Sequence, residues 1–132
     1  MNAIAVALSL TYLAETDRGI VPYDHKGKLQ ITRCFVDDVN RISGKHYQYT
    51  DRMNFKKSNE MAEVWLKYYK PLAEEALNKK LNEYDLAVMY HTGYVGYLRG
   101  DGEAYRNMIQ RKLALLKPSD AIFTALRRAG QV

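Results

Sequence analysis

The 132-residue chain contains a single cysteine, Cys34, and this scarcity excludes two classes of small protein. One thiol cannot form an intrachain disulfide, nor can it build the cysteine cluster that holds a structural zinc ion. Because Cys34 lies between Arg33 and Phe35 in a helical pattern, we expect it to be a buried or half-buried small hydrophobic residue.

The usual signatures of metal, nucleotide and serine-nucleophile sites are missing from the sequence as well. His25, His46 and His91 are not at metal-ligand spacing, and the sequence has no HExxH motif. No G-x-S-x-G elbow is present, and the glycine-rich stretch "GYVGYLRGDG" follows no strand pattern that would make it a phosphate loop. We therefore expect no metal and no cofactor.

Long hydrophobic runs are also few. The apolar start "MNAIAVALSLTYLA" has no positively charged residues before it, so we do not interpret it as a signal peptide, and it is too short to span a bilayer. We expect it to be a buried helix, and we expect the protein to be cytoplasmic until it is released or carried in a virion.

The positive charge of the chain is spread out rather than clustered. The net charge is +5 and the isoelectric point is about 9.3, which favours anionic partners such as nucleic acid, anionic lipid or the cell wall. The nearest approach to a basic cluster is the C-terminal "RRAGQV", so we expect no specific nucleic-acid binding.

The patterns that remain are helical, and no segment alternates as a strand does. They predict an all-α fold, a single domain over residues 1–132 with six or seven helices. The expected helices are 2–15, 29–42, 58–81, 84–93, about 101–117, and 120–130, with loops over 16–28, 45–57 and the glycine-rich 93–102.

Particular residues are expected to begin, end or anchor these helices. Ser58 is a suitable N-cap, and Pro71 should end or kink the helix that follows, with a second segment running to about Leu81. Gly44 is a suitable residue to close the helix before it. The expected interior residues are Met61, Val64, Trp65, Tyr68 and Ile109.

One charged residue stands out at the end of the first predicted helix. Glu15 is the first charge in the chain, in the stretch "YLAETDRG", and Asp24 follows in the predicted loop. A carboxyl at the rim of a buried helix is partly desolvated, which raises its pKa toward that of a general acid. A glycosidase needs such an acid and a second group, and Glu15 with Asp24 meets that requirement, although carboxylates in loops are more commonly solvated.

The order of motifs gives this pair a context. The stretch "AETDRG…YDHKGKLQIT" resembles the pattern of lysozyme-like proteins, in which a glutamate at the end of the first helix is followed by a loop and a Gly-x-x-Gln-hydrophobic motif. The goose-type lysozymes, the soluble lytic transglycosylases and the invertebrate-type lysozymes with their bacterial and phage-borne relatives share it. "CFVDDVNRISGKHY" and "YDLAVMYHTGYVGYLRG" are similar to later segments of the last group, so the resemblance covers roughly residues 3–115.

The resemblance implies roles for particular residues. Glu15 corresponds to the catalytic acid and Gln30 to the motif glutamine, while His91, Gly93 and Gly96 correspond to the turn that closes the glycan groove. The remaining expected site residues are Asp24 as a second catalytic group and four tyrosines as stacking platforms for sugar rings: Tyr23, Tyr90, Tyr94 and Tyr97. Considered by itself, His91 at the end of an apolar helix is more often a structural, half-buried histidine than a proton shuttle.

Two departures from the family pattern keep a second interpretation open. The loop between Glu15 and Gln30 is several residues shorter than in the family. Where the family has an Asn-Gly-Gly-Pro turn, this chain has Thr92, Gly93, Tyr94 and Val95. The expected function is cleavage of the β-1,4 glycan of peptidoglycan by a monomer, as a hydrolase or a lytic transglycosylase. The alternative is a catalytically degenerate relative that binds glycan or a protein partner, for example as a phage structural component.

Overall fold

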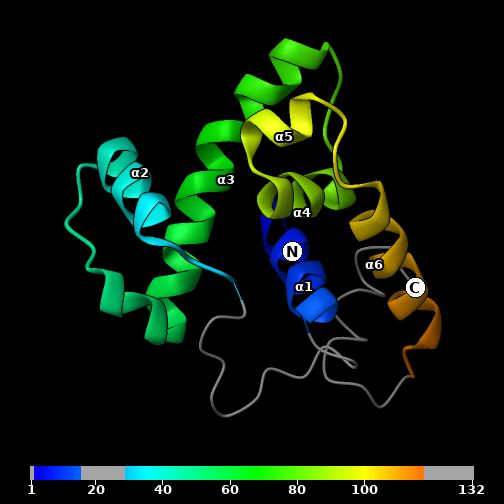
Figure 1. Cartoon of the computed structure of the whole chain (residues 1–132), viewed down its shortest axis with the longest axis horizontal. Coiled ribbons are helices and arrows are strands. Elements are labelled where there is room, and N and C mark those ends of the chain that lie inside the picture. Colours follow the sequence, from blue (N-terminus) through cyan, green and yellow to red (C-terminus); the bar gives the residue numbers. More distant parts are fainter. Residues whose placement is uncertain (1, 16–28, 118–132) are drawn as a thin grey trace.

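The computed structural model describes residues 2–15 and 29–117, and within them the fold is all-α, as predicted (Figure 1). The elements are α1 (Ala3–Glu15), α2 (Arg33–Ser43), the 3-10 helix η1 (Tyr49–Met53), α3 (Phe55–Leu77), α4 (Glu83–Thr92), α5 (Tyr94–Leu98) and α6 (Glu103–Leu115). The predicted loop at 16–28 and the predicted helix at 120–130 lie outside the described residues. No described helix has the length and apolarity needed to cross a membrane.

Helix α1 is the centre of the packing. Its residues from Val6 to Ala14 are buried except for the half-buried Ser9, which confirms the prediction of an enclosed helix. It packs against α4 most extensively, and also against α6 and α3. Burial on nearly all sides explains why the sequence of α1 has no polar face.

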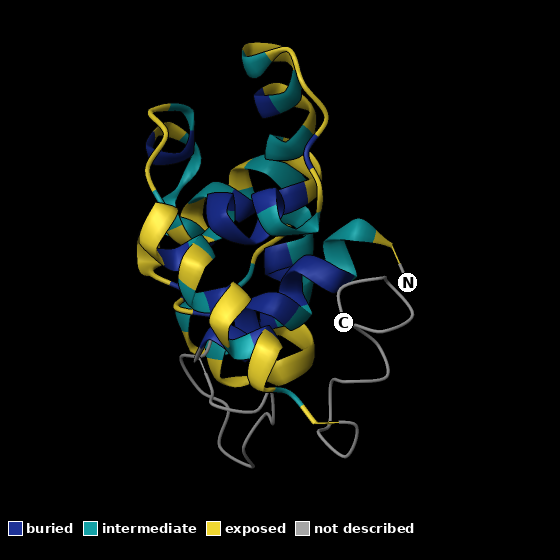
Figure 2. Cartoon of the chain, turned by 90° about the vertical axis from the view of Figure 1, so that its right-hand side faces the viewer, coloured by how far each residue is buried: buried dark blue, intermediate teal, exposed yellow. Residues whose placement is uncertain are grey.

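Helix α3 connects the two sides of the molecule. Helix α2 and η1 pack against α3 on one side, whereas α4, α5 and α6 lie on the other (Figure 1). Buried side chains from all six α-helices form one hydrophobic core, and the exposed residues gather on the outer helix faces and loops (Figure 2). Trp65, Met61 and Ile109 are buried in this core, as predicted.

Several predicted helix boundaries were wrong, and local hydrogen bonds explain the corrections. Helix α2 begins at Arg33 rather than residue 29, because the Thr32 side chain accepts the Phe35 N–H and caps the helix there. Helix α3 begins at Phe55 with Asn54 as its N-cap, so Ser58 is a buried residue inside the helix. Gly44 does adopt the left-handed conformation, with φ 72°, that closes α2.

Two segments that were predicted to interrupt the helices, Pro71 and the glycine-rich stretch, are partly helical in the structure. The helix continues through Pro71 to Leu77 and ends at the left-handed Asn78. The glycine-rich stretch contains the short helix α5, and α6 begins at Glu103. Proline removes one backbone donor and glycine weakens a helix, but packing against neighbouring helices overrides both preferences here.

The exposure of three side chains also differs from prediction. Cys34 is exposed rather than buried, since it lies on the solvent side of α2 while Val36 and Val39 face the core. Tyr68 is 39% exposed, so the predicted Met61–Trp65–Tyr68 stripe leaves the core at its last member. Val64 is only partly buried, packed against the edge of the core.

Candidate functional site

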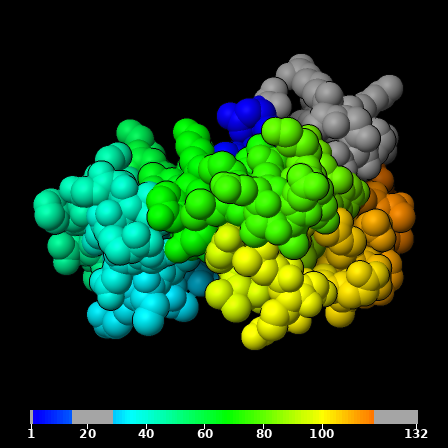
Figure 3. All heavy atoms as spheres, turned by 90° about the horizontal axis from the view of Figure 1, so that it is seen from above, coloured from blue at the N-terminus to red at the C-terminus, as the bar shows by residue number. Residues whose placement is uncertain are grey.

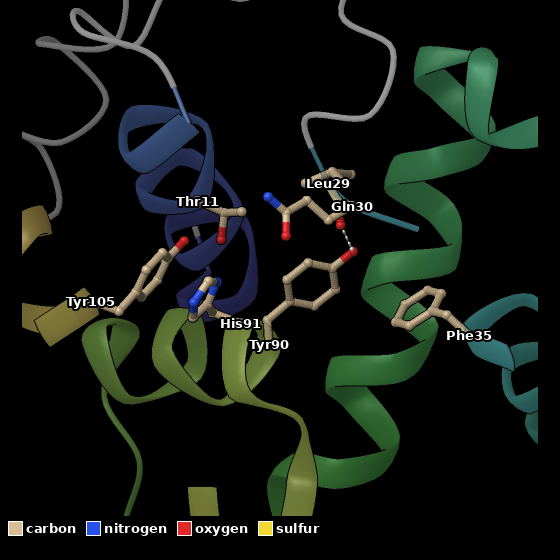
Figure 4. Close-up of a pocket in the computed structure, with 7 residues that line it drawn as sticks. All are labelled: Thr11, Leu29, Gln30, Phe35, Tyr90, His91 and Tyr105. Carbon is tan, nitrogen blue, oxygen red and sulfur yellow. Dashed lines mark hydrogen bonds between the residues drawn. The ribbon is translucent and has the colours of Figure 1, made fainter. Parts of the chain in front are cut away.

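A small pocket lies where α1, α2, α4 and α6 approach the segment at residues 29–30 (Figure 4). Its volume is about 80 Å³, well below the roughly 300 Å³ at which typical small-molecule pockets begin. It is lined by Thr11, Leu29, Gln30, Phe35, Tyr90, His91 and Tyr105. The pocket thus brings together three of the predicted site residues: Gln30, Tyr90 and His91.

Gln30 has an unusual backbone conformation at this pocket. Its φ is +53°, in the left-handed region that residues other than glycine rarely adopt. The neighbouring Leu29 and Ile31 side chains are buried, and the Leu29 carbonyl accepts a 2.7 Å hydrogen bond from the Tyr90 hydroxyl. These anchors hold the strained residue, and the Gln30 side chain extends into the pocket (Figure 4).

Tyr90 forms a wall of the pocket rather than a free platform for a ligand. Its ring meets Phe35 and Trp65 edge-on, with centroid distances of 5.6 and 5.8 Å. Burial raises the pKa of Tyr90 well above its usual value, so the hydroxyl stays protonated and able to donate to Leu29. Tyr90 therefore fixes the 29–30 segment against α4.

His91 and Tyr105 form a stacked pair on the opposite wall. Their rings are nearly parallel, at 3°, with centroids 3.8 Å apart. Tyr105 is buried and His91 is exposed, so the expectation of a half-buried histidine was wrong. His91 is thus an exposed residue of the pocket lining, with one face of its imidazole covered by Tyr105.

The C-terminal end of α1 lies beside this pocket. Thr11 lines the pocket, and α1 ends at Glu15, one helical turn further on. The Lys112 ammonium donates to the Ala14 carbonyl at 2.6 Å, so α6 places a positive charge at the same helix end. The Glu15 side chain, Tyr23 and Asp24 lie outside what the structure describes.

The remaining predicted residues do not line the pocket. Gly93, with φ 82°, ends α4, and Tyr94 begins α5 immediately after it, with its ring 5.0 Å from that of Tyr69. Gly96 is buried against Thr92 and Asp101. The predicted groove turn is therefore a tight connection between two helices.

Tyr97 borders a second, larger cavity of about 300 Å³. Its hydroxyl is buried next to the ion pair of Asp85 and Arg106, whose oxygen and nitrogen are 2.7 Å apart. Burial raises the pKa of Tyr97 to about 12. Burial alone would raise the pKa of Asp85, but hydrogen bonds from Arg106 and the Asn82 N–H outweigh it and lower that pKa.

Sequence reasoning missed part of the pocket lining. Tyr105, Phe35 and Leu29 line the pocket but were not among the predicted site residues. Thr11 carried a usable signal, because it is a buried hydroxyl in an apolar helix, one turn before Glu15. No group of three or more His, Cys, Asp or Glu side chains that could hold a metal ion occurs within residues 2–15 and 29–117.

Comparisons of the chain with protein-family models, with curated proteins and with solved structures found no match.

Proposed function

We propose that this protein cleaves the β-1,4 glycan of peptidoglycan, with Glu15 as the general acid. The observation that carries the proposal is the convergence at one pocket of Gln30 and His91, which are 61 positions apart in the chain, beside the end of α1. The lysozyme-like motif order selected Gln30 and His91 without reference to their positions in space. The presence of both side chains at one pocket is the arrangement that a shared substrate site requires.

The proposed roles follow from the chemistry of each group. Glu15 protonates the glycosidic oxygen as the bond breaks, and the oxocarbenium-like centre is stabilised by Asp24 or by the substrate's own N-acetyl group. Water then completes hydrolysis, or an internal sugar hydroxyl completes the transglycosylase reaction. The Gln30 amide both donates and accepts hydrogen bonds, and the His91–Tyr105 stack offers an aromatic face to a sugar.

The volume of the pocket limits which chemical groups can enter it. A volume of about 80 Å³ holds a substituent rather than a whole sugar ring. An acetamido group fits this limit, and its carbonyl and N–H match the two hydrogen-bonding ends of the Gln30 amide. We infer that the pocket recognises the N-acetyl group of a sugar lying across its mouth.

The second candidate function is glycan or protein binding without turnover. It is favoured by the connection between α4 and α5, where Gly93, Gly96 and Tyr97 pack away from the pocket lining. A site that lacks its closing turn can retain affinity while positioning the scissile bond poorly, and position is critical for catalysis.

Product analysis separates these two functions. Purified peptidoglycan is incubated with the full chain, and new reducing ends and anhydro-sugar products are quantified by chromatography. The glycosidase proposal expects one of the two products to accumulate with time. Retention of the protein on peptidoglycan with neither product would support the binding function instead.

A further inference from the structure

Arg33 and Arg52 both place their guanidinium groups over the ring of Tyr49. The guanidinium carbons lie 4.3 and 3.8 Å from the ring centroid. Arg33 begins α2 and Arg52 lies in η1, so the fold brings together two cations that are well separated in the chain. Because both guanidinium carbons lie close to the same centroid, the two charges are no more than about 8 Å apart, and like charges at that range repel each other unless something neutralises them.

No described carboxylate neutralises this pair. Neither arginine forms an ion pair with a described residue, and Asp37, one turn along α2 from Arg33, makes none with it. Asp51, next to Arg52 in the chain, is already occupied by Lys57 at 3.2 Å and by the Gln48 backbone N–H at 2.8 Å. Two positive charges therefore remain uncompensated around one aromatic ring.

The position of Arg33 adds to the positive potential. It is the first residue of α2, the helix end at which the dipole disfavours a cation, and the first turn contains no acidic residue. The Thr32 side chain occupies only the Phe35 N–H, at 3.1 Å. The two arginines and the N-terminal end of α2 therefore repel one another in the free protein, and binding of an anion would relieve this repulsion.

We propose that the Arg33–Tyr49–Arg52 stack binds an oxyanion of the substrate, a carboxylate or a phosphate. The planar guanidinium fork matches both groups, and the Tyr49 ring holds the two side chains in place before the ligand arrives. Arg33 is the first residue of α2 and Phe35, which lines the pocket, is the third, so the stack and the candidate site both involve the N-terminal end of this helix. The inference rests on the proposed function for its polymer, since peptidoglycan stems carry carboxylates and associated wall polymers carry phosphates.

The test is an NMR titration of the full chain that follows backbone amides and the arginine Nε–Hε groups. Inorganic phosphate is the first probe, followed by muropeptides with free and with amidated carboxylates. We expect saturable shifts at Arg33 and Arg52, and about tenfold weaker phosphate binding in Arg33→Gln and Arg52→Gln. Arg99→Gln is the matched control, because Arg99 is an exposed arginine already paired with Asp101 at 2.8 Å.

Each outcome bears on the proposal. A preference for phosphate, or for free over amidated muropeptide, supports the stack and identifies the oxyanion. Equal binding by Arg33→Gln, Arg52→Gln and Arg99→Gln, or no saturable shift with any probe, overturns it. If a glutamine variant fails to fold, Arg33→Lys keeps the charge but loses the fork and should bind phosphate more weakly than the parent. Oxyanion binding without glycan cleavage would defeat the proposed function and leave the stack intact.

Discussion

At the scale of single residues, Gln30 combines a local cost with a proposed role. Its left-handed backbone costs about 1 kcal/mol relative to glycine, and the buried Leu29 and Ile31 hold it in place. We expect Gln30→Gly to raise the free energy of unfolding by about 0.5–1 kcal/mol and to weaken glycan binding, because the amide is lost. Urea denaturation and chitooligosaccharide titration measure the two effects.

Asn78 provides the control for this substitution. It is the other described non-glycine residue with a positive φ, 51°, and it ends α3 outside the pocket. Asn78→Gly should leave glycan binding unchanged. A loss of binding in Asn78→Gly equal to that in Gln30→Gly would remove the assigned role of the Gln30 amide.

The Asp85–Arg106 pair makes a prediction about pH. The pKa of Asp85 is lowered in the folded protein, so ionised Asp85 stabilises the fold above its unfolded pKa of about 3.9. That stabilisation is lost as the pH falls through the lower, folded-state pKa. Asp85→Asn should cost about 1–3 kcal/mol at pH 7, and its stability should fall less steeply than that of the parent below pH 4.

Asp101→Asn is the corresponding exposed control, since the Asp101 and Arg99 side chains are largely in solvent. It should change the unfolding free energy by less than about 1 kcal/mol. Denaturant melts between pH 2 and pH 7 compare the variants. Parallel pH profiles for the parent and Asp85→Asn would show that Asp85 is not a source of the acid dependence.

The sequence indicated which residues belong to the candidate site more reliably than it indicated how each of them is packed. Gln30 and His91 could be selected because motif order depends only on sequence, and both line one pocket. The exposure of Cys34 and of His91 could not be predicted, because each depends on which neighbouring helix covers it. The positive φ of Gln30 could not be predicted from the sequence either, since the buried residues on both sides impose it.

At the scale of helices, the junction of α4 and α6 depends on Gly102. Its φ is +104°, and a Cβ there would lie 2.4 Å from Val88 Cγ1 and 2.9 Å from Thr92 Cγ2. Gly102→Ala should therefore force α6 away from α4 and cost more than about 3 kcal/mol. Thermal and urea unfolding measure the loss.

Gly44→Ala is the control that distinguishes the cost of backbone strain from the cost of the steric clash at Gly102. It also has a positive φ, 72°, but a Cβ there would meet nothing within 4 Å. Gly44→Ala should cost only about 1 kcal/mol. Equal losses for the two glycines would mean that the contact with Val88 does not constrain the junction.

Helix identities were more predictable than helix ends. Apolar spacing identified the residues of α1, α4 and α6, because each buries a face or its whole surface. The start of α3 was placed three residues late, since Ser58 and Asn54 are both capping residue types and only the fold selects Asn54. Helix α5 was missed because its five residues include a glycine, and packing rather than propensity stabilises it.

At the scale of the whole molecule, one core joins the two sides seen from above in Figure 3. Trp65 is central to that connection, since its ring lies 6.0 Å from Phe35 of α2 and 5.8 Å from Tyr90 of α4. Trp65→Ala should cost about 3–5 kcal/mol. The matched substitution is Tyr68→Ala, at an exposed ring of the same helix, which should cost far less. Similar losses in urea melts would place Trp65 outside the core.

The all-α architecture followed from the sequence because helical periodicity is local, but the pocket did not. It forms where α1, the 29–30 segment, α4 and α6 meet, and those long-range contacts depend on the complete packing. Motif order could select Gln30 and His91, which line the same pocket. It could not indicate that Thr11 and Tyr105 complete the lining, or that Gly96 and Tyr97 lie elsewhere.

The proposed role of Glu15 as a general acid beside this pocket can be tested with the variant Glu15→Gln. Glu15→Gln keeps size and polarity but cannot donate a carboxylic proton. Peptidoglycan binding and cleavage are measured on the same samples of the parent and the variant, at matched stability. We predict unchanged binding and a cleavage rate lower by about 10²- to 10⁴-fold. If the parent cleaves and the Glu15→Gln variant cleaves equally fast, Glu15 is not the general acid.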